Sequence, residues 1–169
     1  MSAPRPVLDE PVRAALDEIN HPVSIASSIR DRDGELIEFR LEFVNLAAAQ
    51  WTGFPREAIV GRHVGELLPA LRSSGLFDEL RSVVDTGKPF RKAGIRFDDA
   101  HIDGRPVGGR FDMGAMRLGD GYISAWQDIG DGDSESDALD RTLRRTHALI
   151  RLIRLESVGR VVLRPGFAT

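Results

Sequence analysis

The most regular pattern in the chain is an alternation of apolar and charged side chains in the run IEFRLEF, residues 37–43. Ile37, Phe39, Leu41 and Phe43 share one parity, and the positions between them are charged. Because successive side chains of a strand point to opposite faces, the run predicts a strand with one apolar and one charged face. The preceding run PVSIASSIR has a similar spacing, and the turn DRDG between the two runs predicts an antiparallel hairpin.

Apolar residues recur with a helical period in two other segments. The pattern between Asp9 and Pro22 predicts a short amphipathic helix near the N-terminus. Its apolar residues are Val12, Leu16 and Ile19. The segment SSGLFDELRSVVDTGKP predicts a longer helix that ends at Gly87. Its apolar face comprises Leu76, Phe77, Leu80, Val83 and Val84.

Residues 43–69, between the hairpin and the longer helix, predict three short helical pieces. The residues that cap or break them are Asn45, Gly53, Pro55, Gly61 and Pro69. Short pieces bury little surface individually, so we expect this segment to wrap around something rather than to form a compact bundle.

Three further runs predict strands in the second half of the chain. The first two are centred on Ile95 and Met113, and the third is GYISAWQDI, residues 121–129. The alternating apolar positions of the first two are Ala93, Ile95, Phe97, Phe111, Met113 and Ala115. The turn segments DDAHIDGR and LGDG separate the three runs and favour a meander. The order of elements predicts an α+β fold in which helices pack on one face of an antiparallel sheet.

The composition changes after Ile129, where a stretch of acidic residues is followed by a stretch of arginines. Apolar residues with 4-7-3 spacing within this region indicate a heptad seam of about two repeats. They are Leu139, Leu143, Ile150 and Ile153. We therefore predict a C-terminal signalling or coiled-coil helix.

These patterns divide the chain into four parts. We expect a disordered start followed by the amphipathic helix over residues 1–19, and the α+β body over 20–130. The C-terminal helix covers 131–156, and a tail covers 157–169.

Composition excludes several classes of function. The net charge of −3 gives no reason to expect nucleic-acid binding. The chain has no cysteine, which excludes disulfides and thiolate nucleophiles and is compatible with the cytoplasm, where we expect the protein. No run of 18 apolar residues predicts a membrane span.

No residue pattern points to catalysis or to a metal site. His63 is expected to be an ordinary surface histidine, and the DDAHID run, residues 98–103, is expected to be a polar turn rather than a cation site. The run DGDSESD lacks the glycine and the glutamate of a calcium loop. We therefore expect neither an enzyme nor a metal protein.

In their order and spacing, these motifs resemble the PAS sensor domains over residues 20–130. The residues of the 43–69 segment that match the family are Asn45, Gly53, Glu57, Gly61 and Pro69. The run SAWQDIG resembles the last strand of the family, although Gly130 stands where the family usually has threonine. The resemblance implies a five-stranded antiparallel sheet of order 2-1-5-4-3, a cavity between sheet and helices, and a role in signalling.

The departures from the family bear on cofactors. The flavin-binding photosensory branch has a reactive cysteine where GRHV places Val64, and this chain has no cysteine. A flavin–cysteine adduct and a thioester-linked chromophore are therefore excluded. The longer helix has no histidine of the kind that haem-binding members use, so we expect no haem. An apolar small-molecule pocket and an empty one both remain open.

The resemblance also implies candidate residues for the pocket. They are Trp51, Phe77, Leu80, Val84, Phe111, Tyr122, Ser124 and Trp126. By the alternation of the last strand, Tyr122 and Ser124 would face inward and supply polar groups, whereas Ile123 and Ala125 would face outward. Ordinary core packing is the alternative reading of the same apolar residues.

Asp128, at the end of the last strand, is the candidate relay from the pocket to the C-terminal helix. We expect a homodimer with a possible output protein or domain. The dimer candidates are Val12, Leu16, Ile19, Ile123, Ala125, Leu139, Leu143, Ile150 and Ile153.

The sequence thus predicts a sensory and dimerisation module. A ligand-free scaffold for another protein is the alternative, and a small α+β enzyme is a third reading. The run RLESVGR, residues 154–160, resembles the lead-in to the phosphoacceptor helix of sensor histidine kinases, but no phosphoacceptor histidine follows it. A stand-alone module and a part of a longer protein are both compatible with this sequence.

Overall fold

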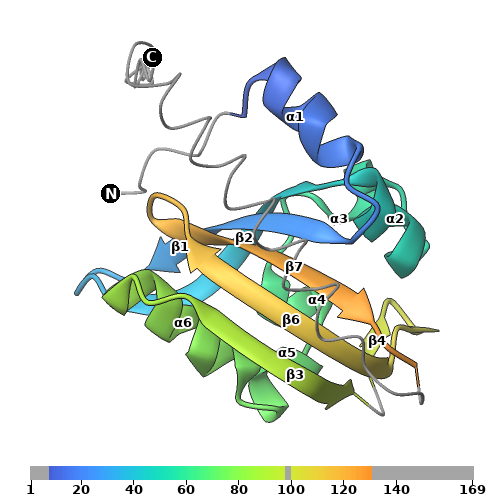
Figure 1. Ribbon diagram of the computed structural model, residues 1–169. Helices are drawn as coiled ribbons and strands as arrows, with labels where there is room; N and C mark the ends of the chain where they lie inside the picture. Colours follow the sequence, from blue (N-terminus) through green and yellow to red (C-terminus); the bar gives the residue numbers. More distant parts are fainter. Residues whose placement is uncertain (1–7, 98–99, 131–169) are drawn as a thin grey trace.

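The computed structural model describes residues 8–97 and 100–130 of the chain (Figure 1). The main strands are β1 (Val23–Arg30), β2 (Leu36–Val44), β3 (Phe90–Phe97), β6 (Gly109–Arg117) and β7 (Gly121–Asp128). A small hairpin consists of β4 (His101–Ile102) and β5 (Arg105–Pro106). The helices are α1 (Glu10–Asp17), α2 (Leu46–Thr52), α3 (Arg56–Ile59), α4 (Val64–Leu67), α5 (Ala70–Ser73) and α6 (Leu76–Thr86).

The main strands form a five-stranded sheet of order β2-β1-β7-β6-β3, and all four pairings are antiparallel. Counted along the chain without the small hairpin, this order is 2-1-5-4-3. The α+β class and the sheet order implied by the resemblance are therefore confirmed. The first and last main strands lie side by side at the centre of the sheet, as in Figure 1.

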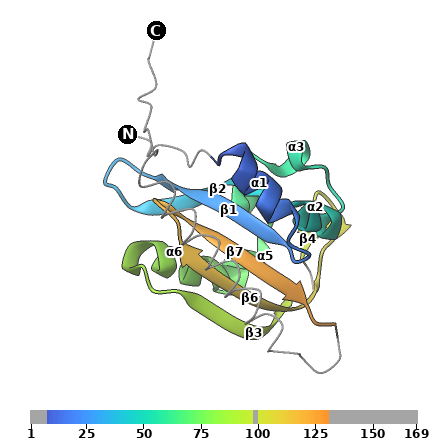
Figure 2. The same cartoon turned by 45° about the horizontal axis from the view of Figure 1, so that its top comes forward.

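The two faces of the sheet are covered by different helices. Helices α2 to α6 pack on one face and enclose the larger core cluster, which includes Phe39, Phe77 and Leu80. Helix α1 lies across the other face, where Leu16 packs against Ile123 in a second, smaller cluster. Figures 1 and 2 show α1 and α6 on opposite sides of the sheet.

Strand β2 departs from the strict alternation that its sequence shows. Its register with β1 shifts twice, so that Ile37 and Glu42 have no partner residue on β1. Each extra residue reverses the side to which the following side chains point. As a result Ile37 is 47% exposed, and Phe43 faces α1 rather than the larger core. The prediction of one continuous apolar face on this strand was wrong at these two positions.

A similar shift corrects the prediction for β3. Its register with β6 jumps between Lys92 and Ile95, and Ala93 is exposed while Ile95 is buried. The backbone amide of Gly94 donates a hydrogen bond to the buried Asp112 carboxylate at 2.8 Å. The polar group in the bulge is thus satisfied by a side chain of the neighbouring strand.

The caps predicted at Asn45 and Gly53 are present. The Asn45 side chain accepts a hydrogen bond from the Ala48 amide at 3.0 Å, and Gly53 ends α2 with a positive φ of 72°. The structure adds one helix that the sequence did not predict, since α5 begins directly after Pro69. Proline is compatible with the start of a helix, because the first amides have no helical partner.

In the described part of the chain, no helix combines the length and apolar character needed to cross a bilayer. The predicted heptad residues, the C-terminal helix and the tail lie outside the described residues.

Candidate functional site

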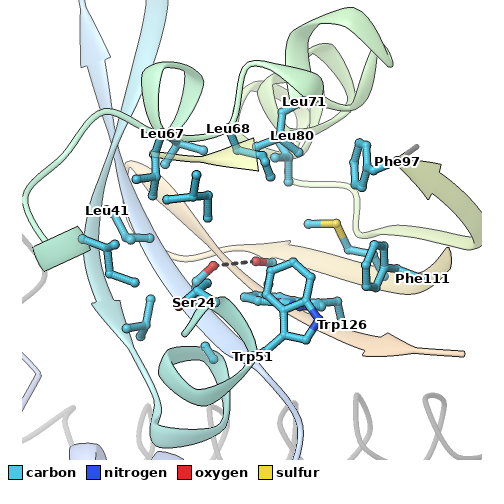
Figure 3. A pocket seen from close by; sticks show the side chains of 18 of the residues that line it. Ser24, Leu41, Trp51, Leu67, Leu68, Leu71, Leu80, Phe97, Phe111 and Trp126 are labelled. Carbon is cyan, nitrogen blue, oxygen red and sulfur yellow. Dashed lines mark hydrogen bonds between the residues drawn. The ribbon is translucent and has the colours of Figure 1, made fainter. Parts of the chain in front are cut away.

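A cavity of about 110 Å³ lies between the sheet and the helices (Figure 3). Its floor is the inner face of the sheet, and its roof is the series of short helices together with α6. The side chains from the sheet and the hairpin are Ser24, Leu41, Val44, Ile95, Phe97, Ile102, Phe111, Met113, Tyr122, Ser124 and Trp126. Those from α2 to α6 and their connections are Ala48, Trp51, Thr52, Ile59, Val64, Leu67, Leu68, Leu71 and Leu80.

Most of the predicted pocket residues lie together around this cavity. They are Trp51, Leu80, Phe111, Tyr122, Ser124 and Trp126. Phe77 and Val84 are buried on α6 but are not among the lining residues. The Phe77 ring instead packs against Phe39 at 5.2 Å between centroids, with the Arg72 guanidinium 3.9 Å from its centre.

Three aromatic rings form one wall of the cavity. The Trp51 ring contacts Phe111 and Trp126 edge-to-face, with centroid separations of 5.2 and 5.5 Å. Such geometry places a positive ring edge against a negative ring face and stabilises the cluster beyond its buried area. Trp51 comes from α2 and the other two rings from the sheet, so this wall joins the roof to the floor.

The polar groups of the cavity are few and neutral. The Ser24 and Ser124 hydroxyl oxygens lie 2.8 Å apart and share a hydrogen bond across β1 and β7. Burial, together with the nearby Glu38 carboxylate, raises the pKa of Tyr122, which therefore stays a neutral phenol. The indole Nε1 of Trp126 is buried and has no hydrogen-bond partner in the described part of the chain.

Charged groups hold the roof in place from outside the cavity. One Glu38 carboxylate oxygen accepts a hydrogen bond from the Gly65 amide at 3.0 Å, and the other accepts one from Arg72 at 2.8 Å. These bonds tie α4 and α5 to strand β2. Arg62 donates two hydrogen bonds to Asp103 and thereby links the roof to the small hairpin.

Within residues 8–97 and 100–130, no group of three or more histidine, aspartate or glutamate side chains is placed to hold a metal ion. The His63 side chain is 43% exposed and lies 3.3 Å from the Glu66 carboxylate. Asp98 and Asp99 of the DDAHID run lie outside the described residues. The side chains that line the cavity are apolar or neutral, with no charged side chain among them.

Asp128 is exposed at the end of β7 and accepts a hydrogen bond from the Gly130 amide at 2.8 Å. Leu16, Ile123 and Ala125, three of the dimer candidates, are buried against one another within a single chain. Val12 and Ile19 pack at the edge of the same cluster. A dimer that uses these residues would require α1 to move.

Sequence reasoning missed the lining residues of the short helices, apart from Trp51, and that of the hairpin. The helices at 56–73 are too short for a periodicity that shows which side faces inward. Ser24 alternates with the apolar positions Val23 and Ile25, so the sequence does not mark it as an inward-facing residue, and its pairing with Ser124 depends on strand register. Ile102 lies in a run that reads as a polar turn.

Comparison with protein families gives a match to the family described as PAS fold over residues 37–131, more than half of the chain. A comparison with curated protein sequences finds no match.

Solved structures similar to this chain include a variant of RsLOV, which is 17% identical with a TM-score of 0.54. That alignment covers 88% of this chain and 99% of the other. The PAS domain of nitrogen regulation protein NR(II) from Vibrio parahaemolyticus is 15% identical with a TM-score of 0.50, and the alignment covers 72% of this chain and all of that domain. A blue-light activated histidine kinase of Erythrobacter litoralis is 19% identical with a TM-score of 0.50. There the alignment covers 82% of this chain and 42% of the kinase. At these identities the likeness concerns the fold alone.

Proposed function

We propose that this chain, which belongs to the PAS family, senses a small molecule and relays its binding through β7 to the C-terminal segment. Members of the family are typically sensory signalling modules of histidine kinases and are generally non-enzymatic. The observation that carries this proposal is the apolar cavity beneath the short helices, whose floor includes strand β7. Tyr122, Ser124 and Trp126 belong to β7, the last strand of the described residues.

The relay has a short physical path. A ligand that presses on Trp126 acts on a residue only two positions before Asp128, the end of β7. The Ile129 amide donates a hydrogen bond to the Arg110 carbonyl at 2.9 Å, so the residue that follows β7 is still bonded to the neighbouring strand β6. A change in how β7 packs would therefore alter the direction in which the chain continues.

Native mass spectrometry of the purified full chain tests the sensory part. A retained small molecule supports the proposal. A clean mass of the polypeptide alone favours a ligand-free scaffold, the alternative function.

The scaffold alternative relies on an apolar outer face of the sheet that another protein covers. In this structure α1 of the same chain covers that face at Ile25, Phe43 and Ile123. The covered face leaves the scaffold function with less support than the cavity gives to the sensor.

PAS domains commonly dimerise and precede kinase outputs, and we propose that this chain forms a homodimer through the segment after Ile129. The sequence-based expectation of a cytoplasmic location belongs to the same proposal. Sedimentation equilibrium should give a weaker dimer for a chain cut after Ile129 than for the full chain. An unchanged dimer affinity would contradict dimerisation through a C-terminal coiled coil.

A further inference from the structure

The cavity has the size of one small ring. Its volume is about 110 Å³, whereas sites for drug-sized ligands have volumes of about 300–1,000 Å³. An engineered apolar cavity of about 150 Å³ in another protein binds benzene. A one-ring molecule therefore suits this space, and a multi-ring cofactor would require the roof helices to move.

The lining of the cavity selects against charge. Tyr122 is the one lining residue with a titratable group, and it is neutral in this setting. An ionised ligand would leave water and meet no opposite charge on the cavity wall, which is unfavourable. A neutral ligand avoids this loss of hydration.

The polar groups at the cavity are able to donate hydrogen bonds. The Ser24 and Ser124 hydroxyls both line the cavity, and the bond between them uses one of their two protons. Figure 3 shows Ser24 beside the aromatic wall, with a hydrogen bond drawn as a dashed line. The second hydroxyl proton is left for another acceptor. Trp126 adds a buried indole N–H, a group that only donates and that has no partner among the described residues.

We propose that the cavity binds a neutral one-ring molecule that carries one hydrogen-bond acceptor, such as a nitrile, a carbonyl or an ether oxygen. The ring lies against the wall formed by Trp51 and Phe111, and the acceptor takes the free proton of the Ser24–Ser124 pair. This inference rests on the proposed sensory function and specifies the class of ligand that is sensed.

Toluene, benzonitrile and benzoate separate the requirement for an acceptor from the requirement for neutrality, because each has one benzene ring and they differ in acceptor and charge. The chain has two tryptophans, Trp51 and Trp126, and both line the cavity, so intrinsic fluorescence reports its occupancy. We expect benzonitrile to bind roughly two- to tenfold more tightly than toluene, as one net hydrogen bond allows. Benzoate should bind at least about tenfold more weakly than benzonitrile.

A double variant, Ser24→Ala with Ser124→Ala, removes the two serine hydroxyls and leaves Trp126, Tyr122 and the apolar walls. It should lose the preference for benzonitrile while toluene binds as before, and unchanged toluene binding also shows that the cavity is intact. Ser82→Ala, at an exposed serine of α6, is the matched control and should keep the preference.

The outcomes separate this inference from the proposed function. If toluene or benzoate equals or exceeds benzonitrile, the ligand class is wrong and the sensory function stands. If the double variant keeps the preference, the acceptor does not bind the serine pair, and that part of the proposal is wrong. If none of the three binds but the purified protein retains another molecule, the class is again wrong. If none binds and the protein has a clean apo mass, both proposals fail.

Discussion

At the scale of single residues, Asn45 connects the two sides of the sheet. It is fully buried, and its side-chain oxygen accepts hydrogen bonds from the Val23 and Ala48 amides. Its amide nitrogen donates to the carbonyls of Leu16, Ile19 and His21. One side chain thus caps α2, anchors the start of β1 and holds the end of α1.

Asn45→Ala should lower the free energy of unfolding by about 3 kcal/mol or more. The change removes a helix cap, worth about 1 kcal/mol, and leaves several buried backbone groups unsatisfied at about 1–3 kcal/mol each, without full additivity. Urea denaturation measures the loss. Asn20→Ala, at an exposed asparagine, should change stability by less than about 0.5 kcal/mol. Equal effects of the two substitutions would contradict the role assigned to Asn45.

The Arg30–Asp120 pair makes a small, pH-dependent contribution. Arg30 donates two hydrogen bonds to Asp120, at 2.7 and 3.2 Å, and these bonds lower the pKa of Asp120 against the opposing effect of partial burial. A carboxylate with a lowered folded-state pKa stabilises the fold above its unfolded pKa. This contribution is lost as the pH falls through the folded-state value.

Asp120→Asn should therefore destabilise the protein at pH 7 by about 0.2–1 kcal/mol, the range for exposed ion pairs. The difference from the unmodified chain should disappear in acid, once both forms carry a neutral side chain at this position. Urea denaturation at a series of pH values measures it, with Asp33→Asn in an exposed turn as the control. A difference that persists undiminished into strong acid would show that charge is not its cause.

At the scale of elements, the sequence predicted which segments are strands and helices better than it predicted their faces. The alternation around Phe39 and the helical stripe around Leu80 are strong local signals, and both elements formed as predicted. The bulges at Ile37 and Glu42 have no such signal, because they depend on how β2 pairs with β1. The face on which Phe43 lies is therefore a property of the pair of strands, not of the run.

Helix α1 depends on this reversed face. Phe43 lies between α1 and α3, with the Arg13 and Arg56 guanidinium groups 5.7 and 5.5 Å from its ring centre. Asp17 at the end of α1 forms an ion pair with Arg56. The helix is thus fixed by the small cluster beneath it and by contacts with α3.

Leu16→Ala should release α1 from the sheet, because Leu16 is 2% exposed and is the buried residue of this helix. Truncation of a buried leucine lowers the free energy of unfolding by about 2–5 kcal/mol. Urea denaturation measures the loss, and amide exchange at β1 should become faster. Glu18→Ala, at the exposed end of the helix, is the control. Slow exchange at β1 in the Leu16 variant would argue that α1 does not protect the sheet.

At the scale of the whole molecule, the central strands β1 and β7 serve both layers. Ser24 and Ser124 face the cavity, whereas Val23, Ile25 and Ile123 carry α1 on the opposite face. An occupant of the cavity therefore contacts the same strands that hold the N-terminal helix and that lead into the C-terminal segment. This double use gives the fold a physical basis for relaying a signal.

The site was predictable from the sequence only in part. Aromatic and hydroxyl residues of β7 were placed in the cavity by strand alternation and the family resemblance, and the structure puts them there. Phe77 shares its helical stripe with Leu80, yet only Leu80 reaches the cavity, since the Phe77 ring is taken up by Phe39. A periodic pattern shows that a residue is buried, but the facing element determines whether it packs or lines a space.

Leu80→Ala should enlarge the cavity and make stability depend on a ligand. Leu80 is 0% exposed and lines the cavity, so its truncation should cost about 2–5 kcal/mol. Saturating toluene should then raise the melting temperature of this variant more than that of the unmodified chain. Val84→Ala, also buried on α6 but outside the cavity lining, should show no extra rise. Equal shifts in the two variants would mean that toluene binds elsewhere.

The most direct test of the relay is amide hydrogen exchange of the full chain with and without saturating benzonitrile, with occupancy confirmed by tryptophan fluorescence. The account predicts slower exchange along β7, residues 121–128, and unchanged exchange in the exposed turn at 31–35. Exchange along β7 that stays the same while the cavity is occupied would contradict it.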